Sequence, residues 1–225
     1  MANNDEAEFG TSQPPRKSDM LFGAETDWKS KLCAASGVDD IIYQDGYRQA
    51  ALHLVNYICE KGGKHDVVYP IIYLYRHHIE LVLKSIIRTA CFLLEREIPS
   101  EIRNTHELSK LWVLTRPLLD PVCKLVDDGD CYPTEDLEGI DSYINQLHVH
   151  DPDSQRFRYP ETKKGMPSLR RGLLRINVRD LSNALEKLVD YLEMTNDWFG
   201  DLIEAKAQYQ MKHGLTPPHH TRRPV

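Results

Sequence analysis

The sequence predicts an all-α protein, an antiparallel bundle of four to five helices with at most a small accessory β-hairpin. Two observations support this prediction. Apolar residues recur at three- and four-residue steps over several long stretches, which is the period of a helix with one buried face. The chain has 225 residues, of which 41% are hydrophobic, enough for one good-sized core. We therefore divide it into a polar, partly disordered segment (1–40), one helical domain (41–212) and a disordered tail (213–225).

The first two helices have the clearest patterns. One is expected from about 44 to 61, with Asp45 as its N-cap and Gly62 ending it. The next begins near 68–71, where Pro70 fits a first turn, and reaches about residue 96. We expect this second helix to organise the core, because it has the most regular apolar stripe. The stripe consists of Ile72, Tyr75, Ile79, Val82, Leu83, Ile86 and Ile87.

Three further helices complete the predicted bundle. Thr105 is the expected N-cap of the third, and Pro117 is expected to interrupt or kink it, because proline removes a backbone donor and crowds the preceding turn. The fourth is expected over about 137–148, where apolar residues again recur at helical spacing. Asn177 is a good cap for the last helix, which we expect to continue to Lys212.

Charge is distributed unevenly along the chain. The net charge is −6, so no global field attracts nucleic acid or an anionic membrane, and an anion-binding surface has to be local. Residues 127–153 hold nine acids and no Lys or Arg, whereas residues 156–175 hold seven bases and one acid. Two prolines and a glycine within 151–165 predict a loop there, with a short extended pair near 157–159 and 173–176.

One face of the helix near 68–96 carries a polar ladder beside its apolar stripe. Arg76, Glu80, Lys84 and Arg88 are each four residues apart, so neighbours lie one turn above each other and can form ion pairs. His77 precedes Glu80 by three residues and lies close to the ladder. Two interpretations are open: the ladder is a solvated salt-bridge face, or it lines a pocket or a dimer cleft.

The cysteines and the absence of membrane signals predict a location. The five cysteines are scattered, odd in number and without a CxxC pair, which favours reduced thiols over disulfides or a zinc site. They are Cys33, Cys59, Cys91, Cys123 and Cys131. No apolar run is long enough for a membrane span, and the N-terminus lacks a basic start and a hydrophobic segment. We therefore expect a cytoplasmic protein that does not insert into a membrane.

Motifs for P-loop, dinucleotide, zincin and calcium binding are absent, so we predict no cofactor and no metal. His77 and His78 are adjacent and point about 100° apart on a helix, which does not suit a zincin site. A weaker alternative is a metal site built from His148, His150, Asp151 and Asp153.

Imidazole, guanidinium and a basic loop together suit metal-free RNA cleavage, in which the 2′-hydroxyl is the nucleophile. The predicted catalytic residues are Arg76, His77, Glu80, His106 and Arg158. The predicted ligand-binding residues are Lys84, Arg156, Phe157, Tyr159, Lys163 and Lys164, whose aromatic rings can stack an unpaired base. Each has a structural alternative: His106 as a helix cap, the aromatic pair as a loop anchor, and the lysines as solvated charge.

Two runs resemble HEPN-domain proteins of bacteria and archaea. They are Tyr-Leu-Tyr-Arg-His-His-Ile-Glu-Leu-Val-Leu-Lys at 73–84 and Thr-His-Glu-Leu-Ser-Lys-Leu-Trp at 105–112, and with the closing helix the resemblance covers about 45–200. It implies an all-α bundle that dimerises. Many members are metal-independent ribonucleases in toxin–antitoxin or anti-phage systems, and others are non-catalytic partners of nucleotidyltransferases.

One departure from the family pattern affects the predicted activity. Catalytic HEPN proteins have Arg and, after four to six residues, His near the start of the last core helix, whereas here Arg179 has no such His. Cleavage would therefore need a rearranged set of residues. The leading hypothesis is a homodimer that binds RNA or a phosphate-bearing ligand and cleaves it. The alternatives are a non-catalytic dimeric interaction module or nucleotidyltransferase partner, and a nucleotide-binding helper.

Overall fold

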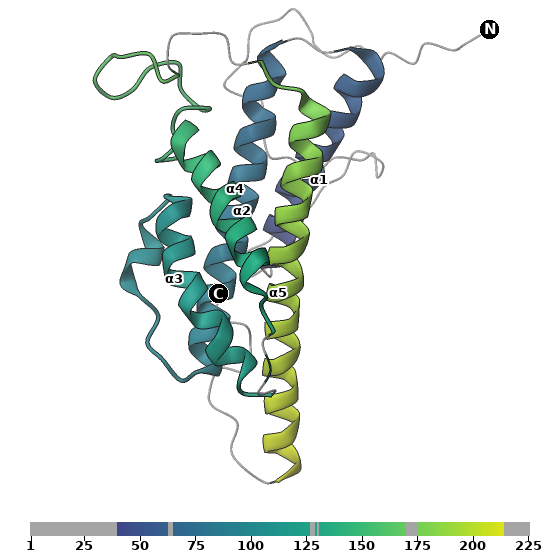
Figure 1. Cartoon of the computed structure of the whole chain (residues 1–225), viewed down its shortest axis with the longest axis vertical. Coiled ribbons are helices and arrows are strands. Elements are labelled where there is room, and N and C mark those ends of the chain that lie inside the picture. The colour runs from purple at the N-terminus through teal and green to yellow at the C-terminus, as the bar shows by residue number, and fades with distance from the viewer. Residues whose placement is uncertain (1–39, 63–64, 127–128, 130, 170–174, 214–225) are drawn as a thin grey trace, which may run out of the picture. The chain divides into compact units, whose positions relative to one another are not determined.

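The computed structural model describes residues 40–62, 65–126, 129, 131–169 and 175–213 (Figure 1). The chain divides into two units, residues 1–37 and 38–225, and the described residues all belong to the second. Apart from Asp40 and His213, the predicted segments 1–40 and 213–225 lie outside the described residues. The described part is all-helical, with five α-helices and two short 3₁₀ helices, so the predicted all-α class is confirmed.

Helix α2 (Val68–Leu93) is the centre of the bundle. It packs against α1 (Asp40–Lys61), α3 (Leu108–Cys123) and α5 (Val178–Lys212). Its apolar stripe explains this position, because burying a residue of the size of Ile or Leu stabilises the fold by about 1.5–3 kcal/mol. All seven stripe residues are buried, as the spacing predicted: Ile72, Tyr75, Ile79, Val82, Leu83, Ile86 and Ile87.

Helices α1 and α2 run in opposite directions and are joined by residues 62–67, which include a 3₁₀ turn (His65–Val67). Gly62 ends α1 with φ of 75°, a conformation that glycine adopts without a steric penalty, and its N–H donates to the carbonyl of Ile58 at 3.0 Å. The predicted glycine stop is confirmed. The predicted cap at Asp45 is wrong, because the helix begins five residues earlier, at Asp40.

Helices α3 and α4 (Thr134–His150) also run antiparallel, since Ser109 contacts His148 and, further along α3, Trp112 contacts Asp141. The predicted break at Pro117 is wrong, because α3 continues through it and through Pro121. Pro117 itself is exposed, so water can reach the carbonyl that it leaves without an intrahelical donor. Thr105 does not cap α3 either: the N-cap is Glu107, whose N–H donates to the Thr105 hydroxyl at 3.2 Å.

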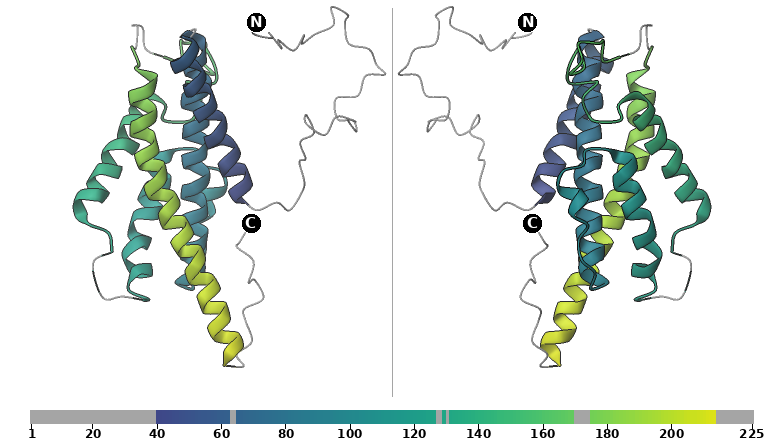
Figure 2. Two further views of the ribbon diagram at one scale, coloured as in Figure 1. Left: turned by 90° about the vertical axis from the view of Figure 1, so that its right-hand side faces the viewer. Right: turned by 90° about the vertical axis from the view of Figure 1, so that its left-hand side faces the viewer.

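Helix α5 lies beside α2 and runs in the same direction (Figure 2). Near the start of both, the Tyr75 and Ser182 hydroxyls are 2.8 Å apart. Two residues past the end of α2, Glu95 forms an ion pair with Lys206 of α5 at 2.9 Å. Asn177 caps α5 as predicted, since its side-chain oxygen accepts hydrogen bonds from the N–H groups of Arg179 and Asp180, and the helix ends at Lys212.

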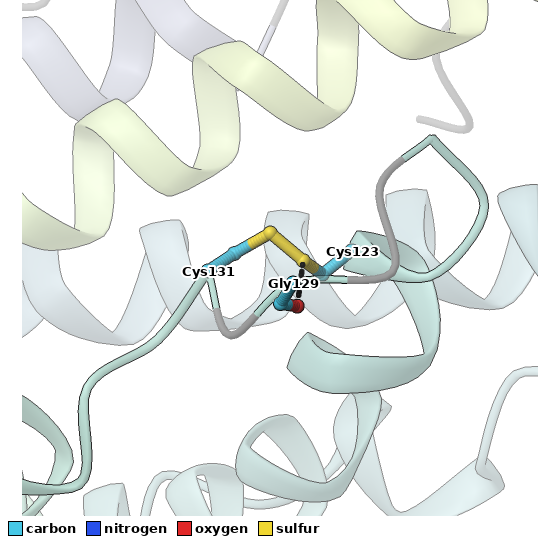
Figure 3. Close-up of a disulfide and its surroundings, with 3 residues drawn as sticks. All are labelled: Cys123, Gly129 and Cys131. Carbon is cyan, nitrogen blue, oxygen red and sulfur yellow. Dashed lines mark hydrogen bonds between the residues drawn. A yellow bond between two sulfur atoms is a disulfide. The ribbon is translucent and has the colours of Figure 1, made fainter.

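The turn after α3 contains a disulfide between Cys123 and Cys131, with the Cα atoms 6.1 Å apart (Figure 3). The expectation that all five cysteines are reduced is wrong for this pair, whereas Cys59 and Cys91 are free thiols. The two partners are eight residues apart, and the chain turns back after α3 so that they meet within disulfide range. Pairing at this separation depends on the fold, so the spacing of the cysteines alone did not indicate it. None of the described helices is long and apolar enough to cross a membrane.

The loop that follows α4, residues 151–169, is anchored at its first residue. Asp151 is buried, and its carboxylate accepts hydrogen bonds from the N–H groups of Gln155 and Arg156 at 2.9 Å each. Residues 156–158 form a turn instead of the predicted extended segment, because this carboxylate folds the chain back on itself. Of its predicted partner at 173–176, residues 173 and 174 lie outside the described residues. An isolated bridge between Glu161 and Pro167 is the only strand-like pairing in the described part of the chain.

Candidate functional site

The polar ladder of α2 is buried. The exposed fraction is 1% for Arg76, 2% for Glu80 and 8% for Lys84. The interpretation of the ladder as a solvated salt-bridge face is therefore wrong for these three residues. They are covered by residues that the sequence places far away, from the segment before α3 and from the loop after α4. We call Arg76, Glu80, Lys84, His106 and Asp151 the ladder cluster.

Arg76 joins α2 to both of these covering segments. Its Nη2 donates to the carbonyl of His106 at 2.8 Å, and its Nε lies 3.3 Å from the carboxylate of Asp151. Its Nη1 is 3.8 Å from Glu80 Oε2. Burial lowers the pKa of Arg76, and the charges of Asp151 and Glu80 oppose that effect. With 1% of the residue exposed, this guanidinium positions its neighbours and presents no surface to a ligand.

Glu80 holds an imidazole at the edge of the ladder cluster. Its Oε1 accepts hydrogen bonds from Lys84 Nζ and His106 Nδ1, both at 2.8 Å. Burial raises the pKa of Glu80, but these two bonds and the nearby positive charges outweigh it, so the pKa lies below its ordinary value and the group is ionised at neutral pH. An ionised carboxylate can only accept, so Nδ1 of His106 has the proton. The His106 side chain is 57% exposed, and its other nitrogen, Nε2, is available for chemistry.

His77 lies one residue from the ladder, between two tyrosine rings. Tyr47 of α1 meets it edge-on with ring centroids 4.4 Å apart, and Tyr73 stacks on it at 5.7 Å. Burial lowers the pKa of His77, and the positive charges of Lys84, His106 and Arg158 lower it further against the opposing charge of Glu80. His77 is therefore neutral at neutral pH and can accept a proton.

The loop brings Arg158 to the same face of α2. Its guanidinium lies over the ring of Tyr73 at 5.3 Å and over that of Tyr159 at 5.2 Å. Because Tyr73 also stacks on His77, one tyrosine ring connects the loop to the imidazole. Tyr47 and Tyr73 were not among the predicted site residues, although Tyr73 and His77 are four residues apart and so share a helix face.

Two hollows surround the loop. The inner hollow, of about 540 Å³, is lined by Tyr69 and by loop residues 156–160 and 167–169. The outer hollow, of about 740 Å³, is lined by Lys163, Lys164 and Arg156, and also by the acids Asp153 and Glu161. Ser168 lines both, is 6% exposed, and its hydroxyl has no hydrogen-bond partner among the described residues.

The predicted ligand-binding residues divide into two groups. Tyr159 is half exposed, and Lys163 and Lys164 occupy the tip of a turn closed by a hydrogen bond between residues 165 and 162. Phe157, in contrast, is buried and anchors the loop. Nη1 of Arg156 donates to the carbonyls of Val149 and His150 at 3.3 Å each, which ties the loop to the last turn of α4.

A second charge cluster was not anticipated from the sequence. Arg48 of α1 forms ion pairs with three carboxylates of α5, Glu186 and Asp190 at 2.5 Å each, and Glu193. His78 is fully buried beside it, with Nδ1 2.9 Å from the carbonyl of Gln44 and Nε2 3.2 Å from Glu193. Acids at positions 186, 190 and 193 share a helix face, which is the signal that could have revealed it. We call this group the α5 clamp.

Residues of the weaker alternative, a metal site, form hydrogen bonds and ion pairs with other groups. His148 Nδ1 is 3.0 Å from the Ser109 hydroxyl, and Asp151 serves Arg76 and the loop backbone. Within the described ranges, no three His, Cys, Asp or Glu side chains are grouped so that they could hold a metal ion.

Comparisons with protein-family models, with curated proteins and with solved structures give no match to this chain.

Proposed function

We propose that this chain is a HEPN-like protein that binds RNA through the 151–169 loop and cleaves it without a metal ion. One observation supports the proposal above all: His77 and Arg158 contact the same tyrosine ring, Tyr73, beside the Glu80–His106 pair. A neutral imidazole, an exposed imidazole oriented by a carboxylate, and a guanidinium are the groups that RNA transesterification needs.

Each group takes a defined role in the proposed reaction. His77 removes the proton from the 2′-hydroxyl, whose oxygen attacks the adjacent phosphorus. His106 acts as the general acid and donates a proton from Nε2 to the departing 5′-oxygen, while the Glu80 carboxylate orients the ring through Nδ1. Arg158 offsets the charge that develops on the phosphate oxygens. The products are a 2′,3′-cyclic phosphate and a 5′-hydroxyl. His77 gains one proton and His106 loses one, so the protons balance.

Binding uses the exposed part of the loop. Tyr159, half exposed under the Arg158 guanidinium, offers a face on which an unpaired base can stack. Lys163 and Lys164 at the turn tip reach phosphates of the same strand. Because these contacts displace counterions, RNA affinity should fall steeply with rising salt concentration.

The test is incubation of the purified protein with total RNA in EDTA. We expect cleavage by the unchanged protein, and losses of about 100-fold or more in His77→Ala and His106→Ala, the usual contribution of a general acid or base. His53→Ala is the matched control, because His53 is exposed on α1 and only contacts the carbonyl of Gln49 in its own helix. Intact RNA with folded protein, or equal cleavage by all variants, would contradict the proposal.

A second function, a dimeric or partner-binding module without catalysis, is favoured by a different observation. Helix α1 exposes Ile42, Tyr43 and Tyr57, each at least 56% accessible, and apolar side chains of this kind are typical of interface centres. Salt concentration separates the two functions, because an apolar interface weakens much less than RNA binding as salt rises.

A further inference from the structure

An apolar cavity of about 220 Å³ lies where α2, α4 and α5 meet the base of the loop. Its walls include Ile72, Tyr143, Leu147, Phe157, Leu181 and Leu185. The proposed cleavage reaction uses none of these residues. Two polar side chains, Gln146 and His150, also line the cavity from the exposed side of α4.

The size and lining of the cavity restrict what it can hold. Pockets for drug-sized ligands measure about 300–1,000 Å³, so this smaller cavity suits a single flat ring system and not a whole nucleotide. Apolar and aromatic walls with a few polar groups at one side are suited to stacking a ring and hydrogen-bonding its edge. Gln146 can both donate and accept such bonds, as the edge of a nucleobase requires.

Phe157 connects this cavity to the surface that binds phosphate. It lines both the apolar cavity and the inner hollow, whose wall also includes Arg156 and Ser168. Ser168 is buried, and its hydroxyl lacks a partner within the described residues, so a donor is available to an oxygen of a ligand. Arg158, the residue that follows Phe157, lies over the ring of Tyr73. Because neighbouring Cα atoms are only about 3.8 Å apart, Phe157 is close to the proposed cleavage site.

We propose that the apolar cavity binds one unpaired nucleobase of the RNA, with the phosphate of the same nucleotide in the inner hollow against Arg156 and Ser168. This inference rests on the proposed function and deepens it, because it makes the substrate a single strand with a selected base at one position. Phe157 and Tyr143 contact the ring, and Gln146 and His150 read its edge.

The test compares two 2′-fluoro oligonucleotides of equal length, one with bases and one without any, binding to the full-length protein. The 2′-fluoro group replaces the attacking hydroxyl, so neither probe is cleaved. We expect the probe with bases to bind at least about tenfold more tightly, as is usual for one stacked base. In Ala184→Phe the new ring fills the cavity, since Ala184 lines it, and this preference should fall about tenfold, to the part that stacking on Tyr159 supplies. Ala205→Phe, on an exposed face of α5, is the matched control and should keep it.

Each outcome has a distinct meaning. Equal binding of both probes to the unchanged protein would overturn the base pocket and leave phosphate binding standing. Binding of neither probe would overturn the proposed function together with the pocket. A preference that is undiminished in Ala184→Phe would also overturn the pocket. If that variant does not fold, Gln146→Glu replaces it, because Gln146 is exposed. The order of affinity for four homopolymers should then differ between Gln146→Glu and the unchanged protein. An unchanged order would contradict the assignment of Gln146 to the base edge.

Discussion

The ladder cluster and the α5 clamp are both groups of charges packed against α2, yet they differ in what they present to solvent. In the ladder cluster the guanidinium and carboxylate are buried, and an imidazole that is 57% exposed stands at the edge beside the loop. In the α5 clamp the imidazole of His78 is fully buried, and the exposed member is Asp190, at 59%. The first cluster offers a proton-transfer group to a ligand, whereas the second connects helices.

The comparison teaches that charge on a central helix does not by itself mark a site. Both clusters bring Arg, His and Glu together, and both bridge elements that are distant in sequence. The two clusters differ in their neighbours. The ladder cluster adjoins the aromatic stack of His77, Tyr73 and Arg158, whereas the described ion pairs of the α5 clamp join residues of helices. Substitutions in the two clusters and in the aromatic stack are expected to lower the free energy of unfolding by different amounts.

The largest loss is expected for Glu80→Ala. It leaves Lys84 buried without its carboxylate, and breaking a buried pair costs about 3–5 kcal/mol of unfolding free energy. Glu107→Ala is the control, because Glu107 pairs with an exposed lysine, Lys110, and should change stability by less than about 1 kcal/mol. Urea denaturation measures both. A loss in Glu80→Ala no greater than in the control would contradict the buried-pair description.

A smaller loss is expected for Arg48→Ala in the α5 clamp. Its partners are partly exposed, at 21%, 59% and 23%, so water can solvate them in part, and the expected cost is about 1–3 kcal/mol. RNA cleavage should stay within twofold of the unchanged protein when assayed well below the melting temperature. Loss of cleavage in a folded Arg48→Ala variant would show that the two clusters are not separate in function.

The pH dependence of stability tests the electrostatics of Glu80. Its pKa is below the ordinary value in the folded protein, so it contributes stability that is present above the unfolded-state pKa of about 4.3 and is lost as the pH falls through the folded pKa. Glu80→Gln should therefore lose less stability than the unchanged protein between pH 6 and pH 3. Urea midpoints at several pH values measure this. Parallel curves for the two proteins would contradict a depressed pKa.

The smallest effect on stability is expected for Arg158→Ala. The Arg158 side chain is exposed, and its contacts with described residues are to tyrosine rings and the Tyr159 hydroxyl, so unfolding free energy should change by no more than about 1 kcal/mol. RNA cleavage should nevertheless fall by about 100-fold, because a preorganised charge at the phosphate is lost. Arg103→Ala is the control, because Arg103 is an exposed arginine in the 3₁₀ helix Ser100–Arg103 before α3. Full activity in Arg158→Ala would remove this residue from the reaction.

The sequence predicted what local periodicity determines. The stripe of α2 was identified because seven apolar residues at helical spacing can only face a core, and the stop at Gly62 and the cap at Asn177 depend on neighbours within a few residues. The passage of α3 through Pro117 was missed, because it depends on tertiary packing of that helix rather than on its propensity.

Burial of the ladder could not be predicted in the same way. The groups that cover Arg76 are the carbonyl of His106 and the carbonyl and carboxylate of Asp151, which are 30 and 75 residues away in the chain. The fold nevertheless brings His77, Glu80, His106 and Arg158, which come from three segments, near one another. Their proximity follows from the fold and not from any spacing in the sequence.

The most direct test of the central claim, that these residues form a metal-free RNA-cleaving site, is to identify the ends of the cleavage products. A defined single-stranded RNA is incubated in EDTA with the unchanged protein and with Arg158→Ala, and the fragments are examined by mass spectrometry. We expect 2′,3′-cyclic phosphate and 5′-hydroxyl ends that form far more slowly with the variant. Intact RNA in the presence of folded protein, or fragments with 5′-phosphate ends, would contradict it.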